Sequence, residues 1–154
     1  MLPMKKRIAT LLLISSLPLG ANAASDAVKH LSPEGAIEPT ATWGLASRAG
    51  NTLYVAGMRG IDPETNTLVE GDEARVRQAF MNMKHIVESA GGDLADTLRL
   101  VVYVTDMYRF RPLGNKVQKE LWGDGPYPPR TIVEVDRLNQ DDILEVEGTF
   151  YIDE

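Results

Sequence analysis

The chain has 154 residues, a formal net charge of −6 and no cysteine. The excess of negative charge makes nucleic acid an unfavourable partner, and the lack of cysteine excludes disulfide bonds and a thiol nucleophile. With only two histidines and no clustered ligands, no metal site is expected.

The first residues predict a targeting segment. Residues 5–7 are basic, residues 8–19 form an apolar run, and Ala21 and Ala23 supply the small-x-small pattern that a signal peptidase reads. Because a membrane-spanning helix needs about 20 apolar residues, a cleaved secretory signal over residues 1–23 is favoured over an uncleaved anchor. Cleavage would remove three basic and no acidic residues, leaving one domain over residues 24–154 with a net charge of −9. We expect a secreted, most simply periplasmic, protein with no membrane partner.

The next segments predict strands and loops. Prolines and a glycine within residues 24–39 indicate an extended arm with at most one short edge strand, at residues 29–31. Residues 42–48 and 52–57 are predicted to be two strands joined by a tight turn. Residues 59–71 contain turn formers and no periodicity, which is typical of a long loop.

Two helices are predicted in the second half of the chain. Apolar residues recur every three or four positions from Val76 to Ala90, with acidic residues before them and two glycines after them. Residues 98–105 then form an apolar run that predicts a strand buried on both faces. A weaker helix is predicted over residues 110–121, with Pro112 in its first turn.

Two C-terminal strands, residues 130–135 and 143–151, complete the order β-β-β-α-β-α-β-β. This order predicts an α+β fold in which two helices cover one face of a mixed sheet. Apolar residues on the last strands should leave the other face of the sheet apolar, and we therefore expect a closed homo-oligomer whose sheets face inward. The residues on which this expectation depends are Leu144, Val146 and Phe150, with Ile132, Val133 and Val135.

Arg130 is the strongest candidate for a functional residue. It follows two prolines at the start of one strand, and the next strand carries Glu145 and Glu147 on alternate positions. A guanidinium group can bind a carboxylate through two parallel hydrogen bonds, and a nearby glutamate can hold or deprotonate water. The pattern favours a pocket for a small carboxylic acid and a hydrolytic step. The alternative is a surface salt bridge between neighbouring strands.

The chain resembles the RidA (YjgF-type) family of reactive intermediate deaminases, from Ala36 to Tyr151. The most specific block is the last one, which aligns without a gap. The similar segments are Ala36-Ile37-Glu38-Pro39, Val55-Ala56-Gly57, Ala74-Arg75-Val76-Arg77-Gln78 with Asn82-Met83-Lys84, Val102-Tyr103-Val104-Thr105-Asp106-Met107, and Pro128-Pro129-Arg130-Thr131 through Glu134-Val135-Asp136-Arg137-Leu138 to Leu144-Glu145-Val146-Glu147.

The resemblance implies a chorismate-mutase-like fold, a homotrimer with pockets between subunits, and an enzyme that needs no cofactor. It implies hydrolytic deamination of 2-enamino and 2-imino acids to 2-oxo acids and ammonia. Arg130 would bind the substrate carboxylate, Glu145 would activate water, and backbone groups of Ile132 would help to bind both. Glu147 shares the face of Glu145 and is the alternative water-handling residue.

Several positions of the implied pocket depart from the family pattern. Thr40 replaces an aromatic residue, Ala56 a serine and Met58 a glutamine, while Gly114 replaces an asparagine, although Asn115 is the next residue. Thr40, Gly57, Met58 and Gly114 are nevertheless predicted to line the substrate site, and Arg59 adds a cation at its mouth. The rival interpretation is a non-catalytic binding module for a small carboxylate metabolite. A ribonuclease is disfavoured by the predicted export and the acidic surface.

Overall fold

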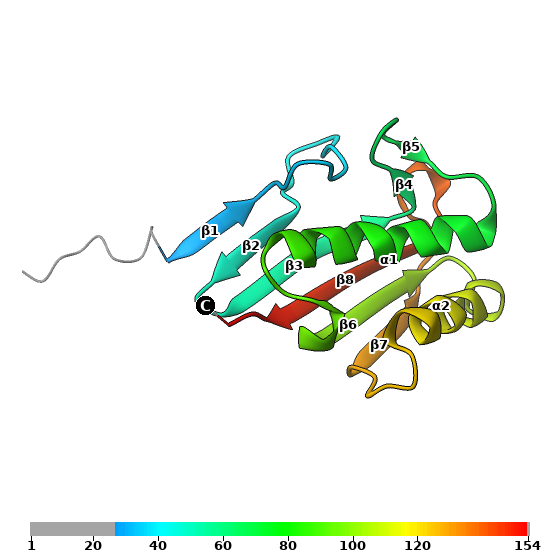
Figure 1. Ribbon diagram of the computed structural model, residues 1–154. Coiled ribbons are helices and arrows are strands. Elements are labelled where there is room, and N and C mark those ends of the chain that lie inside the picture. Colours follow the sequence, from blue (N-terminus) through cyan, green and yellow to red (C-terminus); the bar gives the residue numbers. More distant parts are fainter. Residues whose placement is uncertain (1–26, 154) are drawn as a thin grey trace, which may run out of the picture.

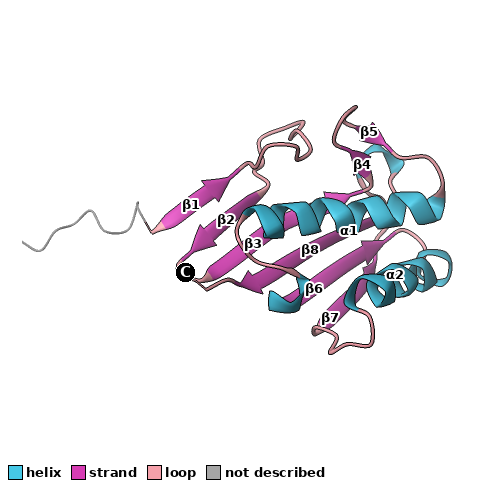
Figure 2. Ribbon diagram, viewed as in Figure 1, coloured by secondary structure: helices cyan, strands magenta, loops and turns pink. Residues whose placement is uncertain are grey.

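Two helices lie side by side across one face of a six-stranded sheet (Figure 1). The computed structural model describes residues 27–153, so the predicted signal segment lies outside the described residues and stays a prediction. Both helices cover the same face, and we call the opposite side of the sheet the open face (Figure 2). No helix between residues 27 and 153 is long and apolar enough to span a bilayer.

The central strand of the sheet is the last one in the sequence. The strand order is β1-β2-β3-β8-β6-β7, in which β6 and β7 are parallel and the other neighbours are antiparallel. The fold therefore has the predicted α+β class and order of main elements. The strands are β1 Val28–Leu31, β2 Ala46–Ala49, β3 Thr52–Arg59, β4 Ile61–Asp62, β5 Thr67–Leu68, β6 Thr97–Val104, β7 Arg130–Glu134 and β8 Leu144–Tyr151; the helices are α1 Asp72–Ser89 and α2 Met107–Trp122, with 3₁₀ turns at Leu94–Asp96 and Asn139–Asp141.

Helix α1 forms as its sequence predicts. Its apolar stripe, including Val76, Phe80 and Met83, is buried against the sheet. The helix ends where Gly91 adopts a φ of 89°, and the N–H groups of Gly91 and Gly92 donate to the carbonyls of Glu88 and Val87. These two bonds form a Schellman motif, which satisfies carbonyls that the helix end would otherwise leave unpaired.

Two local predictions were wrong. The segment 59–71 is not a plain loop, because β4 and β5 pair within it as a short antiparallel hairpin. Helix α2 begins three residues earlier than predicted, since the Asp106 carboxylate accepts a hydrogen bond from the Arg109 N–H at 2.9 Å and caps it. Pro112 consequently lies beyond the first turn. Because proline has no N–H, the carbonyl of Tyr108 receives no hydrogen bond from position 112. The helix tolerates this loss at the surface, where Tyr108 is 91% exposed.

The open face is not the apolar surface that the sequence predicted. Leu144, Val146 and Phe150 are fully buried under the helices, so they belong to the core. The intervening residues of β8 are only half-buried and face the other way, because side chains alternate along a strand. Similarly, β6 is fully buried at Leu100, Val102 and Val104 but not at the residues between them, so the predicted burial of both its faces was wrong for the single chain. The oligomer stays a prediction.

Candidate functional site

Arg130 is held in place by helix α2. It is the first residue of β7, the strand at one edge of the sheet. Its Nη1 donates to Oε1 of Gln118 and its Nη2 to Oδ1 of Asn115, each at 2.7 Å. Because positions 115 and 118 are three residues apart, they lie on the same face of the helix. The two amide oxygens orient the guanidinium without neutralising its charge.

The Arg130 guanidinium lacks a negative partner in the described part of its own subunit. No ion pair among residues 27–153 includes it, so the alternative of a salt bridge to a neighbouring strand is not what the single chain forms. Burial, and secondarily the nearby Arg111, lower the pKa of Arg130. The group lies in a hollow of about 430 Å³ lined by Asn115, Gln118, Lys119, Tyr127, Pro128 and Arg130. An arginine keeps its charge in proteins, so this hollow favours a small anion.

Glu145 lies in a different environment, on the central strand β8. It stands opposite Arg59 of β3 and Tyr103 of β6 in the sheet register. Its carboxylate Oε2 is 3.9 Å from the Arg59 Nε, and 26% of its side chain is exposed. Burial raises the pKa of Glu145, the positive charge of Arg59 lowers it, and the negative charges of Glu147 and Asp142 raise it further.

Gly57 provides the space for the Glu145 carboxylate. The register between β3 and β8 shifts between Val55 and Met58, so a bulge places Ala56 and Gly57 opposite one residue of β8. A Cβ atom built on Gly57 would overlap Oε1 of Glu145. The carboxylate therefore lies directly against the backbone of Gly57, and a larger residue could not be accommodated without moving it.

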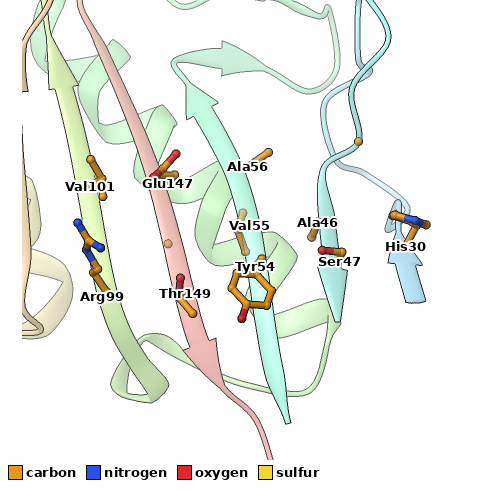
Figure 3. Close-up of a pocket in the computed structure, with 12 residues that line it drawn as sticks. His30, Ala46, Ser47, Tyr54, Val55, Ala56, Arg99, Val101, Glu147 and Thr149 are labelled. Atoms are coloured by element: carbon orange, nitrogen blue, oxygen red, sulfur yellow. The ribbon is translucent and has the colours of Figure 1, made fainter. Parts of the chain in front are cut away.

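Glu147, the alternative water-handling residue, faces a separate hollow (Figure 3). This hollow, of about 380 Å³, lies over the middle of the open face between β2, β3, β8 and β6. Tyr54, Arg99 and Thr149 surround Glu147 there, and the helices lie behind the sheet. Glu145 is not part of this lining. The two glutamates thus share a face of β8, as predicted, but have different neighbours.

Arg130 and Glu145 do not meet within one subunit. Arg130 is in register with Leu100, which is buried under the helices, whereas Glu145 is in register with Tyr103, whose neighbours Val102 and Val104 are the buried residues of β6. Residues paired across neighbouring strands point to the same face, so the two candidates belong to opposite faces of the sheet. A common cavity for them requires a second subunit.

The other residues predicted to contact a ligand differ in how exposed they are. Thr40 is exposed in the segment before β2, and Ile132 is half-buried on the same face of β7 as Arg130. Met58 and Gly114 are buried in the single chain: the Met58 side chain lies in the core, and Gly114 is on the buried face of α2, where a Cβ built on it would lie 3.4 Å from Cδ1 of Leu144. Neither offers a side-chain surface to a ligand in one subunit, and their place in the substrate site stays a prediction.

Asn115 and Gln118 are site residues that the sequence motifs do not predict. The family pattern draws attention to Asn115 only as the neighbour of Gly114, and no motif indicates Gln118. Their shared helix face was a usable signal, but the pairing of α2 with the start of β7 was needed to interpret it. No group of three or more His, Asp or Glu side chains in the part of the chain that the structure describes is arranged to hold a metal ion.

Residues 33–152 match the protein family model described as endoribonuclease L-PSP. The chain belongs to the RidA family. A RutC family protein of Pyrococcus horikoshii is 40% identical over 119 residues, covering 77% of this chain and 93% of the relative. A Dermatophagoides farinae protein named 2-iminobutanoate/2-iminopropanoate deaminase is 34% identical over 119 residues, covering 75% and 90%.

The RidA fold is equally clear from a solved structure. The structure of a probable translation initiation inhibitor from Rhodopseudomonas palustris superimposes with a TM-score of 0.79 at 49% identity, covering 81% of this chain and 98% of that one. The predicted family and fold are therefore confirmed. The names of these RidA relatives differ, so they indicate a family that has deaminases among its members. The activity of this chain has to be inferred from the residues of its own site.

Proposed function

We propose that this RidA protein hydrolyses reactive 2-enamino and 2-imino acids to 2-oxo acids and ammonia. The observation that carries the proposal is the Arg130 guanidinium, half-buried, oriented by two neutral amide oxygens and without a carboxylate partner among residues 27–153. The carboxylate of a small imino acid would supply the missing anion through two parallel hydrogen bonds. The Dermatophagoides farinae relative, named as a deaminase of such acids, supports this substrate class.

The complete site is proposed to form between subunits of a closed trimer. Within one chain Arg130 and Glu145 belong to opposite faces of the sheet, so a site that uses both needs two copies. Two features support this arrangement: β7 is the edge strand with Arg130 at its first residue, and Glu145 is on the open face. An edge strand of one subunit packed along the open face of the next would bring the two groups together around a closed ring.

The proposed reaction needs only these two groups and water. Arg130 binds the carboxylate and so fixes the position of the adjacent C=N carbon. Glu145 accepts a proton from water as the oxygen adds to that carbon, and it returns this proton to the imine nitrogen, which becomes the amine of a carbinolamine. Glu145 then takes the hydroxyl proton and passes it to the amine as the C–N bond breaks, so that the carbonyl of the 2-oxo acid forms and ammonia leaves. An enamine enters the same path after protonation at carbon converts it to the imine.

The predicted signal segment bears on where this reaction would occur. If residues 1–23 are removed during export, the enzyme would act on imino acids that arise in the periplasm. The single domain over residues 24–154 would then be the exported protein. Cell fractionation with an antibody to the chain tests this part of the proposal, which is contradicted if the full-length chain remains in the cytosol.

An amino-acid oxidase assay tests the proposed activity. The oxidase generates an imino acid in solution, and the added protein should accelerate the release of ammonia from it. Arg130→Ala should abolish the acceleration. Arg137→Ala is the matched control, because Arg137 follows the same strand but is exposed and paired with Asp141 at 3.4 Å. Acceleration that survives in Arg130→Ala would contradict the assignment of Arg130 as the clamp, that is, the residue that binds the substrate carboxylate.

One observation favours a second candidate, a binding module without catalysis. Met58 and Gly114 are buried in the core, so two positions of the implied pocket supply no polar group to a substrate. Calorimetric titration with pyruvate and 2-oxobutanoate separates the two candidates. Binding that depends on Arg130 with no acceleration of any imino acid would support the binding module and reject the deaminase.

A further inference from the structure

Arg59 is a buried cation beside the proposed catalytic carboxylate. It is the last residue of β3, and only 5% of its surface is exposed. Its Nη1 donates to the carbonyl oxygen of Asn139 at 2.7 Å, and its own carbonyl accepts a hydrogen bond from Nδ2 of Asn82 at 3.0 Å. The guanidinium and the main chain of Arg59 are therefore both held by hydrogen bonds, and its Nε lies 3.9 Å from Oε2 of Glu145.

The other ionisable groups that face Glu145 do not favour its charged form. Glu147 lies two residues after Glu145 on β8, and Asp142 lies in the segment that leads into β8. The negative charges of both residues raise the pKa of Glu145. Tyr103 of β6 faces the same group with an uncharged hydroxyl whose own pKa is raised by burial and by the two glutamates. Among the described residues that act on Glu145, Arg59 is the one positive charge.

The ionisation of Glu145 decides whether it can work as a proton acceptor. A carboxylate that is partly buried beside other carboxylates tends to take up a proton, and a protonated carboxyl group cannot accept one from water. A positive charge about 4 Å away opposes that tendency. Because Arg59 is buried and hydrogen-bonded to the Asn139 carbonyl, its charge is held beside Glu145.

We propose that Arg59 is a positioning residue that keeps Glu145 ionised and directed over the backbone of Gly57, so that the carboxylate remains available as a proton acceptor. Its catalytic consequence rests on the proposed deaminase function. Arg59 is not among the residues that hold the Arg130 guanidinium, which are Gln118 and Asn115 of α2.

Arg75 provides the matched control. Its Nε is 3.9 Å from Oδ1 of the buried Asp142, which is the same distance as between the Arg59 Nε and Oε2 of Glu145. Arg75 is not among the charges that act on Glu145. Removing Arg75 perturbs the same buried cluster without removing the cation that faces Glu145, and therefore separates a local charge effect from general damage to the structure.

Carbon-13 NMR of the intact protein labelled at the glutamate carboxyl carbon tests the proposal directly. The Glu145 signal is assigned by its loss in Glu145→Gln, and its titration midpoint is followed in each variant. We expect the midpoint to rise by about one pH unit or more in Arg59→Met, to return most of the way in Arg59→Lys, and to stay within a few tenths of a unit in Arg75→Met. An unchanged midpoint in Arg59→Met, or an equal rise in Arg75→Met, would overturn it.

Folding and activity are controlled separately. Circular dichroism establishes that each variant folds; if Arg59→Met does not, Arg59→Gln, which keeps a donor for the Asn139 carbonyl, takes its place with the same expected rise. The NMR result requires no turnover, so it stands even if the deaminase function fails. If turnover is observed, the acid limb of the kcat/KM profile should move to higher pH in the neutral variant by the same amount as the midpoint. An acid limb that does not move would refute the role of Arg59 in catalysis.

Discussion

Replacing Gly57 by alanine should disable the proposed catalytic carboxylate while leaving the substrate clamp intact. The added methyl group would occupy the position of the Glu145 Oε1 atom, so the carboxylate must rotate away from the bulge in β3. General base catalysis typically contributes about 10²–10⁴ in rate, which corresponds to roughly 3–5 kcal/mol of transition-state stabilisation. We therefore expect kcat to fall by about 10²–10⁴ in Gly57→Ala.

The division between kcat and KM makes this prediction specific. Arg130 is held by Gln118 and Asn115 of α2, which the substitution does not touch, so KM should change by less than about threefold. Gly44→Ala is the control, because no atom lies within 4 Å of a Cβ built there and its backbone does not need glycine. A folded Gly57→Ala protein with kcat within twofold of wild type would refute the assignment of Glu145 as the proton acceptor.

Three further predictions concern the residues that hold Arg130, a buried acid and a glycine of α2. Asn115→Ala and Gln118→Ala should each weaken binding of a 2-oxo acid about fivefold by calorimetry, since each loses one hydrogen bond to Arg130 worth about 1 kcal/mol; unchanged affinity in both would reject their orienting role. Burial raises the pKa of Asp142, so the wild type loses stability as pH rises through the ordinary aspartate range toward that raised pKa. The free energy of unfolding of Asp142→Asn relative to wild type, from urea titrations, should consequently increase between about pH 4 and pH 7. Gly114→Ala should raise the stability of α2 by roughly 0.5–1 kcal/mol, because the new methyl group makes an ordinary contact with Leu144 and removes a glycine from a helix interior. The activity of this variant tests the predicted place of Gly114 in the substrate site: a large loss would support that place, and activity equal to wild type would contradict it.

The elements that the sequence predicted well are those set by local patterns. Helix α1 follows from a repeat of apolar residues and from the glycines that end it, and both act over only a few neighbouring positions. The start of α2 was misplaced because the capping carboxylate of Asp106 outweighed the weaker apolar pattern that follows. Local signals of similar strength compete at element ends, so boundaries are predicted less reliably than the elements themselves.

The chemistry of the candidate site was visible in single residues of the sequence, and their spatial relations were not. Arg130 and Glu145 could be selected because a guanidinium and a carboxylate after strand-like segments suit carboxylate binding and proton transfer. Only the register of β8 against β3 and β6 decided that Glu145 faces away from the helices, and that Arg59, far from it in sequence, lies beside it. A shift of one residue in a strand moves every side chain to the other face, so facing and neighbours depend on pairing between distant segments that no local pattern specifies.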